Sequence, residues 1–145
     1  TAFDTHAWLL RERPDDFDVT IITTYPGTPY YDDAVPHRTI AGVWTYTAKN
    51  GDQLHAYDAN FAEVAEYYKG DPNGGYRSFV FTDALSAEDL VALRDFLERD
   101  VRAKLGIPFN SGVAAINFEH SMGQLGRLPG YILRQTDSKV GSLAM

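Results

Sequence analysis

Four histidines are the side chains of this sequence best suited to acid–base chemistry or metal binding: His6, His37, His55 and His120. No two of them stand four residues apart, the spacing that places two imidazoles on one face of a helix. His120 lies between Glu119 and Ser121, so a carboxylate, an imidazole and a hydroxyl are neighbours in sequence. Because adjacent residues rarely point at one substrate, a small hydrolase using His120 ranks third among three interpretations.

Carboxylates and aromatic rings offer two further kinds of site. Asp32 and Asp33 follow a Pro-Gly-Thr-Pro turn, where they can hold a cation or a substrate hydroxyl. An aspartate at such a place is also an ordinary cap of a turn or helix, which is the favoured interpretation. Eight of the nine tyrosines, together with Trp44, can line a pocket for a flat or apolar ligand, although we expect most of them to pack in the core. They are Tyr25, Tyr30, Tyr31, Tyr46, Tyr57, Tyr67, Tyr68 and Tyr76.

The composition of the 145 residues excludes several classes of site and partner. The chain has no cysteine, so it cannot form a disulfide, a thiolate zinc site or a cysteine-ligated iron–sulfur cluster by itself. A net charge of −7 argues against nucleic acids and anionic membranes as partners. No apolar run reaches the roughly 20 residues of a membrane span, and no secretory signal opens the chain. We therefore expect a single cytoplasmic domain.

The region best placed to position a site is the β-branched run 19–24 and the turn after it. Six consecutive β-branched residues favour a strand buried on both faces, as in the centre of a parallel sheet. The Pro-Gly-Thr-Pro sequence that follows Tyr25 removes backbone donors and lets Gly27 take a positive φ, so the chain must leave the sheet here. Ligands gather at the carboxyl ends of strands in α/β folds, which makes 25–31 the first place to look.

A helix precedes this predicted strand. Phe3, Ala7 and Leu10 follow one another at helical spacing within 2–12, and Pro14 stops the helix. Helix, short loop and buried strand together make half of a repeating α/β unit. Because no second run of this quality follows in the chain, the parallel neighbours of the strand are either missing or replaced by another kind of pairing.

The remainder of the sequence, after this turn, predicts a mixture of helices and a hairpin. Asn50-Gly51 between two alternating runs indicates a hairpin with a type I′ turn. Ser86 with Asp89 forms a capping-box pattern at the start of a long helix, and Gly106 ends it. The predicted elements are a hairpin at about 40–57, a helix at about 58–68, a short strand at 77–82, a helix at about 87–105 and a frayed tail at 137–145.

The long helix carries many charges, which we expect to form a solvated face rather than a binding patch. They belong to Glu88, Arg94, Asp95, Glu98, Arg99, Asp100 and Arg102.

The opening helix, the strand and the turn Tyr25-Pro26-Gly27-Thr28-Pro29 together resemble the last helix–strand unit of a radical S-adenosylmethionine enzyme. The resemblance is closest to the branch with an N-terminal cobalamin-binding domain, in which the sixth and last strand of a partial (β/α) barrel commonly ends in such a turn. It implies a mixed α/β chain in two parts. Residues 1–35 would be the last helix and strand of the barrel, and residues 36–145 an α+β C-terminal extension.

The same resemblance implies a cofactor set that this chain does not hold alone. Family members bind a 4Fe–4S cluster through Cys-x-x-x-Cys-x-x-Cys, so this metal-binding motif, the other strands and any cobalamin domain would lie upstream of Thr1. The expected partners are that remainder of the barrel and a small-molecule substrate. Thr23, Tyr25, Pro26, Gly27 and Thr28 would lie beside the S-adenosylmethionine or substrate pocket as walls, with no catalytic residue among them.

By this interpretation the chain is a fragment, as a start at threonine rather than methionine also suggests, and it is inactive alone. The alternative is a free-standing small α+β module in which the hairpin and the turn bind a ligand or a partner chain.

Overall fold

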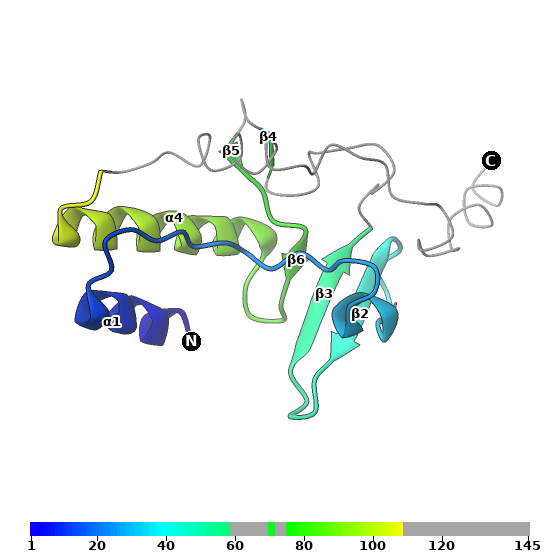
Figure 1. The fold of residues 1–145 in the computed structure, drawn as a ribbon. Coiled ribbons are helices and arrows are strands. Elements are labelled where there is room, and N and C mark those ends of the chain that lie inside the picture. The colour runs from blue at the N-terminus through cyan, green and yellow to red at the C-terminus, as the bar shows by residue number, and fades with distance from the viewer. Residues whose placement is uncertain (59–69, 72–74, 109–145) are drawn as a thin grey trace.

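The computed structural model describes residues 1–58, 70–71 and 75–108, and the elements within these ranges mix helix with sheet (Figure 1). No helix among these residues is long and apolar enough to cross a membrane. The helices are α1 (Ala2–Glu12), α2 (Pro29–Asp32) and α4 (Ala87–Leu105). The strands are β1 (Val35–Pro36), β2 (Val43–Thr47), β3 (Gln53–Tyr57), β4 (Gly70–Asp71), β5 (Gly75–Tyr76) and β6 (Val80–Phe81).

The main sheet is antiparallel, with strand order β1-β2-β3-β6. Its centre is the predicted hairpin, in which β2 and β3 pair from Val43 opposite Tyr57 to Thr47 opposite Gln53. The predicted type I′ turn is wrong, because only Gly51 has a positive φ and the Asn50 side chain instead bonds to Asp52. The short strand predicted at 77–82 is β6, which lies on the outer side of β3.

Capping interactions between residues close in sequence set the ends of both long helices, α1 and α4. In α4 the Ser86 side chain accepts from the Asp89 N–H, the Asp89 carboxylate accepts from the Ser86 N–H, and Gly106 closes the helix in the left-handed conformation. In α1 the same reciprocal pair forms between Thr1 and Asp4. The prediction of a helix at about 87–105 is confirmed.

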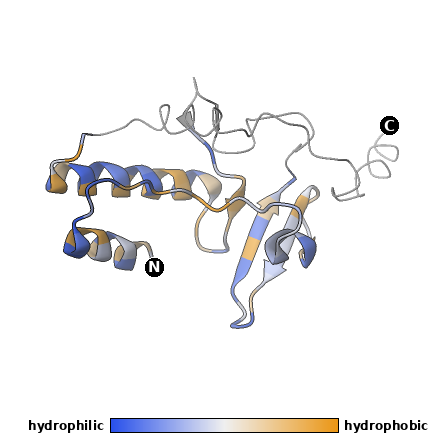
Figure 2. Ribbon diagram, in the orientation of Figure 1, coloured by the Kyte–Doolittle hydropathy of each residue, from blue (hydrophilic) through white to orange (hydrophobic). Residues whose placement is uncertain are grey.

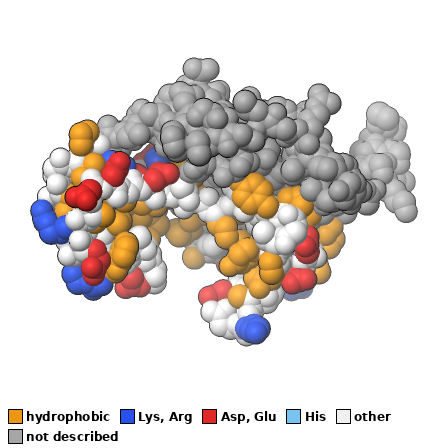
Figure 3. Space-filling view, viewed as in Figure 1, with side chains coloured by type: hydrophobic (Ala, Val, Ile, Leu, Met, Phe, Trp, Pro, Cys, Tyr) orange, Lys and Arg blue, Asp and Glu red, His pale blue; other side chains and the backbone are white. Residues whose placement is uncertain are grey.

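Within the described residues, the buried apolar side chains come from the main sheet and from all three helices. They are Leu9, Tyr31, Val43, Ala56, Val80, Leu97 and Val101. Figure 2 shows the apolar positions of α4 alternating with polar ones along the helix. Large apolar side chains also remain on the surface, among them Phe3 at 78% and Trp8 at 50% exposure in α1 (Figure 3 shows apolar side chains exposed on this face).

The run 19–24 is not a β-strand, so the prediction of a buried parallel strand is wrong for this structure. The chain is extended here but pairs with no strand within the described ranges, and it runs along α4 instead (Figure 1). Its side chains are not buried on both faces, since Thr20 and Ile22 are exposed whereas Val19 and Ile21 are half-buried. A β-strand forms hydrogen bonds with the backbone of a neighbouring strand. Here side chains of α4 bond to the backbone of the segment instead.

The prediction that the charged residues of α4 form a solvated face is also wrong in part. Arg94, Glu98 and Arg102 are buried, because the extended chain lies over them, whereas Glu88 and Arg99 are exposed as predicted. The helix predicted at about 58–68 lies, apart from Asp58, outside the residues that the structure describes, and so do the tail at 137–145 and His120 with its neighbours.

Asp100 joins α1 to α4 and gives a pH-dependent prediction. Its carboxylate accepts from Lys104 Nζ at 2.8 Å and contacts His6 Nε2 at 2.5 Å, and these two partners, Lys104 first, hold the pKa of Asp100 below its usual range. A pKa that is lower in the folded protein than in the unfolded chain contributes stability above the unfolded pKa of about 3.9, and this stability is lost as the pH falls through the folded pKa.

We expect urea midpoints of the protein to exceed those of Asp100→Asn at pH 5 and to converge with them towards pH 2. The exposed Asp15→Asn is the control, and parallel curves for Asp100→Asn would contradict the assignment.

Candidate functional site

The turn after Tyr25 is built by hydrogen bonds between its own residues. The Tyr25 carbonyl accepts from the Thr28 N–H at 3.1 Å and from Thr28 Oγ1 at 2.7 Å. The Asp32 carboxylate accepts from the Gly27 N–H at 3.1 Å, which confirms its predicted role as a cap. Thr28 is the N-cap of α2, which begins at Pro29, where a missing N–H is harmless. The turn is therefore closed by hydrogen bonds between its own residues and Asp32.

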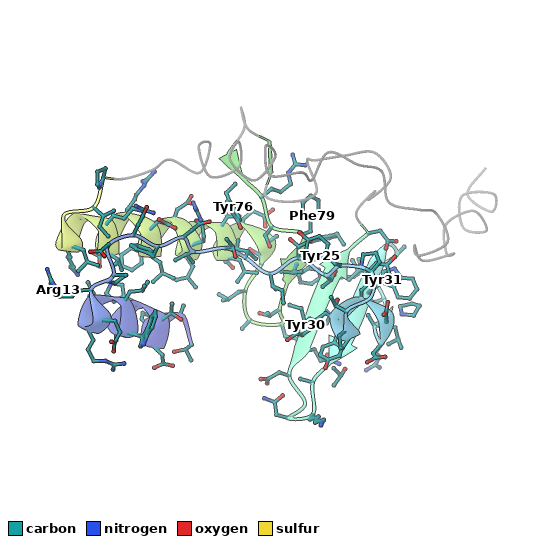
Figure 4. All side chains as sticks on the ribbon, in the orientation of Figure 1. Arg13, Tyr25, Tyr30, Tyr31, Tyr76 and Phe79 are labelled. Atoms are coloured by element: carbon teal, nitrogen blue, oxygen red, sulfur yellow. The ribbon has the colours of Figure 1, made fainter. Side chains whose placement is uncertain are left out.

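Tyrosines fix this turn to the hairpin (Figure 4). Tyr31 in α2 is buried, and the ring of Tyr30 meets Tyr46 of β2 edge-on, with ring centroids 5.0 Å apart. Such aromatic pairs are favourable beyond the area they bury. The turn thus lies against Tyr46 of the hairpin.

The structure brings four of the five predicted site residues together in this turn. Tyr25, Pro26 and Thr28 are half-buried, and Gly27 is exposed at the tip. Thr23 lies two residues before Tyr25 in the extended chain and is half-buried. Nothing lies within 4 Å of the place where a Cβ of Gly27 would stand, so a ligand can approach the backbone closely at this point.

Gly27 gives a prediction for the turn itself. Its φ of 89° is rarely adopted by residues with a side chain, so Gly27→Ala is expected to lower the free energy of unfolding by about 1–2 kcal/mol. Gly27→Asn should cost less, because asparagine tolerates the left-handed region better. Urea denaturation measures both. Equal stability of Gly27→Ala and the unchanged protein would mean that the turn rearranges freely.

The extended segment, residues 17–25, is held to α4 by side chains that bond to its backbone. The Val19 N–H donates to Glu98 Oε1 at 2.6 Å, and the Val19 carbonyl accepts from Arg94 Nε at 2.8 Å. The Ile21 N–H donates to the Tyr76 hydroxyl at 2.9 Å. These bonds replace the ladder that a neighbouring strand would supply.

Arg102 continues this row of bonds at the beginning of the segment. Its guanidinium donates to the carbonyls of Phe17 and Pro108, to Asp16 Oδ1 at 2.9 Å and to Glu98 Oε2 at 2.6 Å. It also lies over the Phe17 ring, 4.7 Å from the centroid. Burial acts to lower the pKa of Arg102, but Glu98 and then Asp16 outweigh it and raise that pKa. Arg102 therefore stays charged in the folded protein.

Arg94, Glu98 and Arg102 form a buried charged stripe on α4. Glu98 is 1% exposed and lies between the two arginines, of which Arg94 is 3% and Arg102 7% exposed at the side chain. Arg94 also pairs with Asp95 at 3.0 Å and with Asp18 at 3.5 Å. Buried charges are tolerated when paired and hydrogen-bonded, as they are here. The spacing of four residues in the sequence predicts that these three side chains share one face of α4. No neighbouring residue in the sequence indicates that a chain segment covers this face.

Three histidines lie in the described part, and each has hydrogen-bond partners. His55 is 2% exposed, with Nδ1 2.8 Å from Thr45 Oγ1 and Nε2 2.7 Å from Asp83 Oδ1. The His37 ring lies 5.0 Å from that of His55, an approach that sequence spacing could not reveal because the sheet register creates it. With both of its nitrogens engaged, His55 serves the structure of the sheet.

Metal binding finds no support in the described ranges, where no group of three histidine, cysteine, aspartate or glutamate side chains could hold an ion. A cavity of about 370 Å³ opens between Tyr76–Ser78 and the first turns of α4, beside Glu88 and Asp95. It shares no residue with the Tyr25–Thr28 turn.

Comparisons with known proteins give no match: neither a family model, nor a curated protein, nor a solved structure resembles this chain significantly.

Proposed function

We propose that this chain is the C-terminal part of a cytoplasmic radical S-adenosylmethionine enzyme and that it closes the active site of a barrel formed with the residues before it. The observation that carries the proposal is the extended segment, which has a β-branched sequence but no strand beside it in the described ranges. It ends in the Tyr-Pro-Gly-Thr-Pro turn that the resemblance places at the mouth of such a barrel.

The exposed apolar surface of the opening unit supports this proposal. Phe3, Trp8 and Ile22, the last 43% exposed, belong to the helix and segment that would form one unit of the barrel. Large apolar side chains at a surface indicate contact with another layer of protein when they gather in one unit. In the intact enzyme, neighbouring strands and helices would cover them.

The residues of this chain do not fit the cluster itself. There is no cysteine, and the described ranges offer no other cluster of ligands. The proposal therefore assigns the 4Fe–4S cluster, the reductive cleavage of S-adenosylmethionine to a 5′-deoxyadenosyl radical and any cobalamin to the remainder of the polypeptide. Thr23 and Tyr25–Thr28 contribute a wall: an open glycine backbone at Gly27 and the aromatic ring of Tyr25 beside it, facing the small-molecule substrate or S-adenosylmethionine.

The test begins with the DNA upstream of the codon for Thr1. A continuous reading frame that encodes Cys-x-x-x-Cys-x-x-Cys is expected. The full polypeptide, purified without oxygen and reconstituted with iron and sulfide, should then hold four irons and release 5′-deoxyadenosine from S-adenosylmethionine under a strong reductant. A continuous frame without the three cysteines, or a full polypeptide that binds no cluster, would refute the proposal.

A free-standing α+β binding module is the second candidate, and the buried charged stripe favours it. The stripe ties residues 16–19 to α4 across more than 70 positions of sequence, which gives this chain long-range contacts of its own. This candidate expects the turn and hairpin to bind a ligand or a partner chain, and a complete gene product that begins near Thr1. The reading-frame test above decides between the two.

A further inference from the structure

The tip of the β2–β3 hairpin carries two residues that can react with each other without an enzyme. Asn50 is followed by Gly51, both are exposed, and the tip projects away from the other described elements (Figure 1). Glycine has no Cβ to hinder a reaction at its backbone nitrogen. Nothing lies within 4 Å of the place where a Cβ of Gly51 would stand. Water therefore reaches this peptide bond.

The reaction converts the asparagine into an acid. The Gly51 nitrogen loses its proton to hydroxide and forms a bond to Asn50 Cγ, the bond from Cγ to Nδ2 breaks, and the amide nitrogen takes up a proton and leaves as ammonia. Water then opens the cyclic succinimide at either of its two carbonyls. The products are aspartate and isoaspartate, in which the main chain runs through the side-chain carbons. No atom changes its oxidation state, so no oxidant or reductant is needed.

The folded turn holds both groups that must react. The Gly51 N–H donates to the Ala48 carbonyl at 2.9 Å, so the nitrogen must give up this bond before it can lose its proton. Asp52 holds the Asn50 side chain, because Asn50 Nδ2 donates to Asp52 Oδ2 at 2.8 Å and Asn50 Oδ1 accepts from the Asp52 N–H at 3.1 Å. Breaking one such bond first slows a reaction by about two- to tenfold.

The pairing of the two strands keeps this turn closed. The Ala48 N–H donates to the Asp52 carbonyl at 2.8 Å, and the ladder continues from Thr47 opposite Gln53. Ala48 thus donates to one residue of the tip and accepts from another. The Gly51 nitrogen is released when the tip opens.

We infer that Asn50 is a site of isoaspartate formation that the folded hairpin restrains, with Asp52 as the residue that holds the reacting side chain. The reaction proceeds from the open form of the tip, so its rate measures how often the tip opens. All the residues of the site belong to this chain, so the site exists whether or not a barrel precedes Thr1.

Mass spectrometry of the full chain measures the rate of this reaction. The folded chain and the chain unfolded in guanidinium chloride are incubated side by side at neutral pH. The peptide that contains Asn50 is followed for the mass gain of deamidation and for labelling by an isoaspartate-specific methyltransferase. We expect Asn50 to react at least about tenfold more slowly in the folded chain, because more than one hydrogen bond must break first.

Asp52→Ala tests the role of the restraining carboxylate. It removes the acceptor of Asn50 Nδ2, so the ratio of the unfolded rate to the folded rate should fall by about threefold or more. Asp52→Asn keeps an acceptor oxygen and should restore most of that ratio.

Gln53→Ala is the matched control in the same hairpin. It removes the bond from Gln53 Nε2 to Thr47 Oγ1, at 3.2 Å, and leaves the bonds of Asn50 and Gly51 in place. Its ratio of rates should match that of the unchanged chain.

Three results would overturn the inference. Asn50 that stays unmodified even in the unfolded chain would not be a site of this reaction. Reaction in the folded chain at the unfolded rate or faster would show that the turn does not restrain it. A ratio that falls equally in Asp52→Ala and Gln53→Ala would show that general loosening of the hairpin sets the rate, and not the contact between Asn50 and Asp52.

Discussion

Glu98→Ala is expected to lower the free energy of unfolding by about 3–5 kcal/mol, a large share of the stability of a domain of this size. The substitution leaves the Arg94 and Arg102 guanidinium groups buried without their shared carboxylate, and it leaves the Val19 N–H without its acceptor. Urea denaturation followed by circular dichroism measures the loss. If the variant fails to fold, Glu98→Gln provides the measurement, since the amide keeps an acceptor for Val19.

Glu88→Ala is the matched control, because Glu88 is an exposed glutamate of the same helix. An exposed substitution away from such networks is expected to change stability by no more than about 0.5 kcal/mol. If the Glu88 and Glu98 variants lose a similar amount of unfolding free energy, the charged stripe is exposed to water in solution and stabilises the fold no more than an ordinary surface charge does.

Arg102→Lys is expected to cost about 2–3 kcal/mol although it keeps the charge, because each lost hydrogen bond to a charged group contributes about 1.5–3 kcal/mol. The guanidinium of Arg102 reaches Glu98, Asp16 and two backbone carbonyls at once and stacks on Phe17. A lysine ammonium is a compact charge that cannot reproduce this fork or the stacking. Thermal and urea denaturation measure the effect.

The comparison for this prediction is Arg99→Lys, at an exposed position three residues earlier in the same helix. We expect its midpoint to match that of the unchanged protein. If Arg102→Lys is equally harmless, the contacts of the guanidinium are interchangeable with those of a simple cation, and the role given to Arg102 is wrong.

Features that depend on neighbours in sequence could be predicted, because their physical cause is local. The capping pair Ser86 and Asp89 places the start of α4, Gly106 places its end, and Asn50-Gly51 places the hairpin. The Asp32 cap of the turn belongs to the same class, since its partner Gly27 is five residues away. The mixed helix and sheet follows from these local signals.

Features that depend on distant residues could not be predicted. The β-branched run 19–24 reveals a preference for extended backbone, but whether it becomes a strand depends on what lies beside it. A charged face looks the same in sequence whether water or a chain segment covers it, so the burial of Arg94 and Glu98 was missed. Likewise, His37 meets His55 only because of the order of the strands.

The row of side-chain bonds along Phe17, Val19 and Ile21 also limits how large a sheet can become. A sheet curls into a complete cylinder only if its last strand can bond to its first. Here the edge that would make this closing contact is filled by arginine and glutamate from α4. A strand that paired with this segment would therefore have to approach the opposite edge.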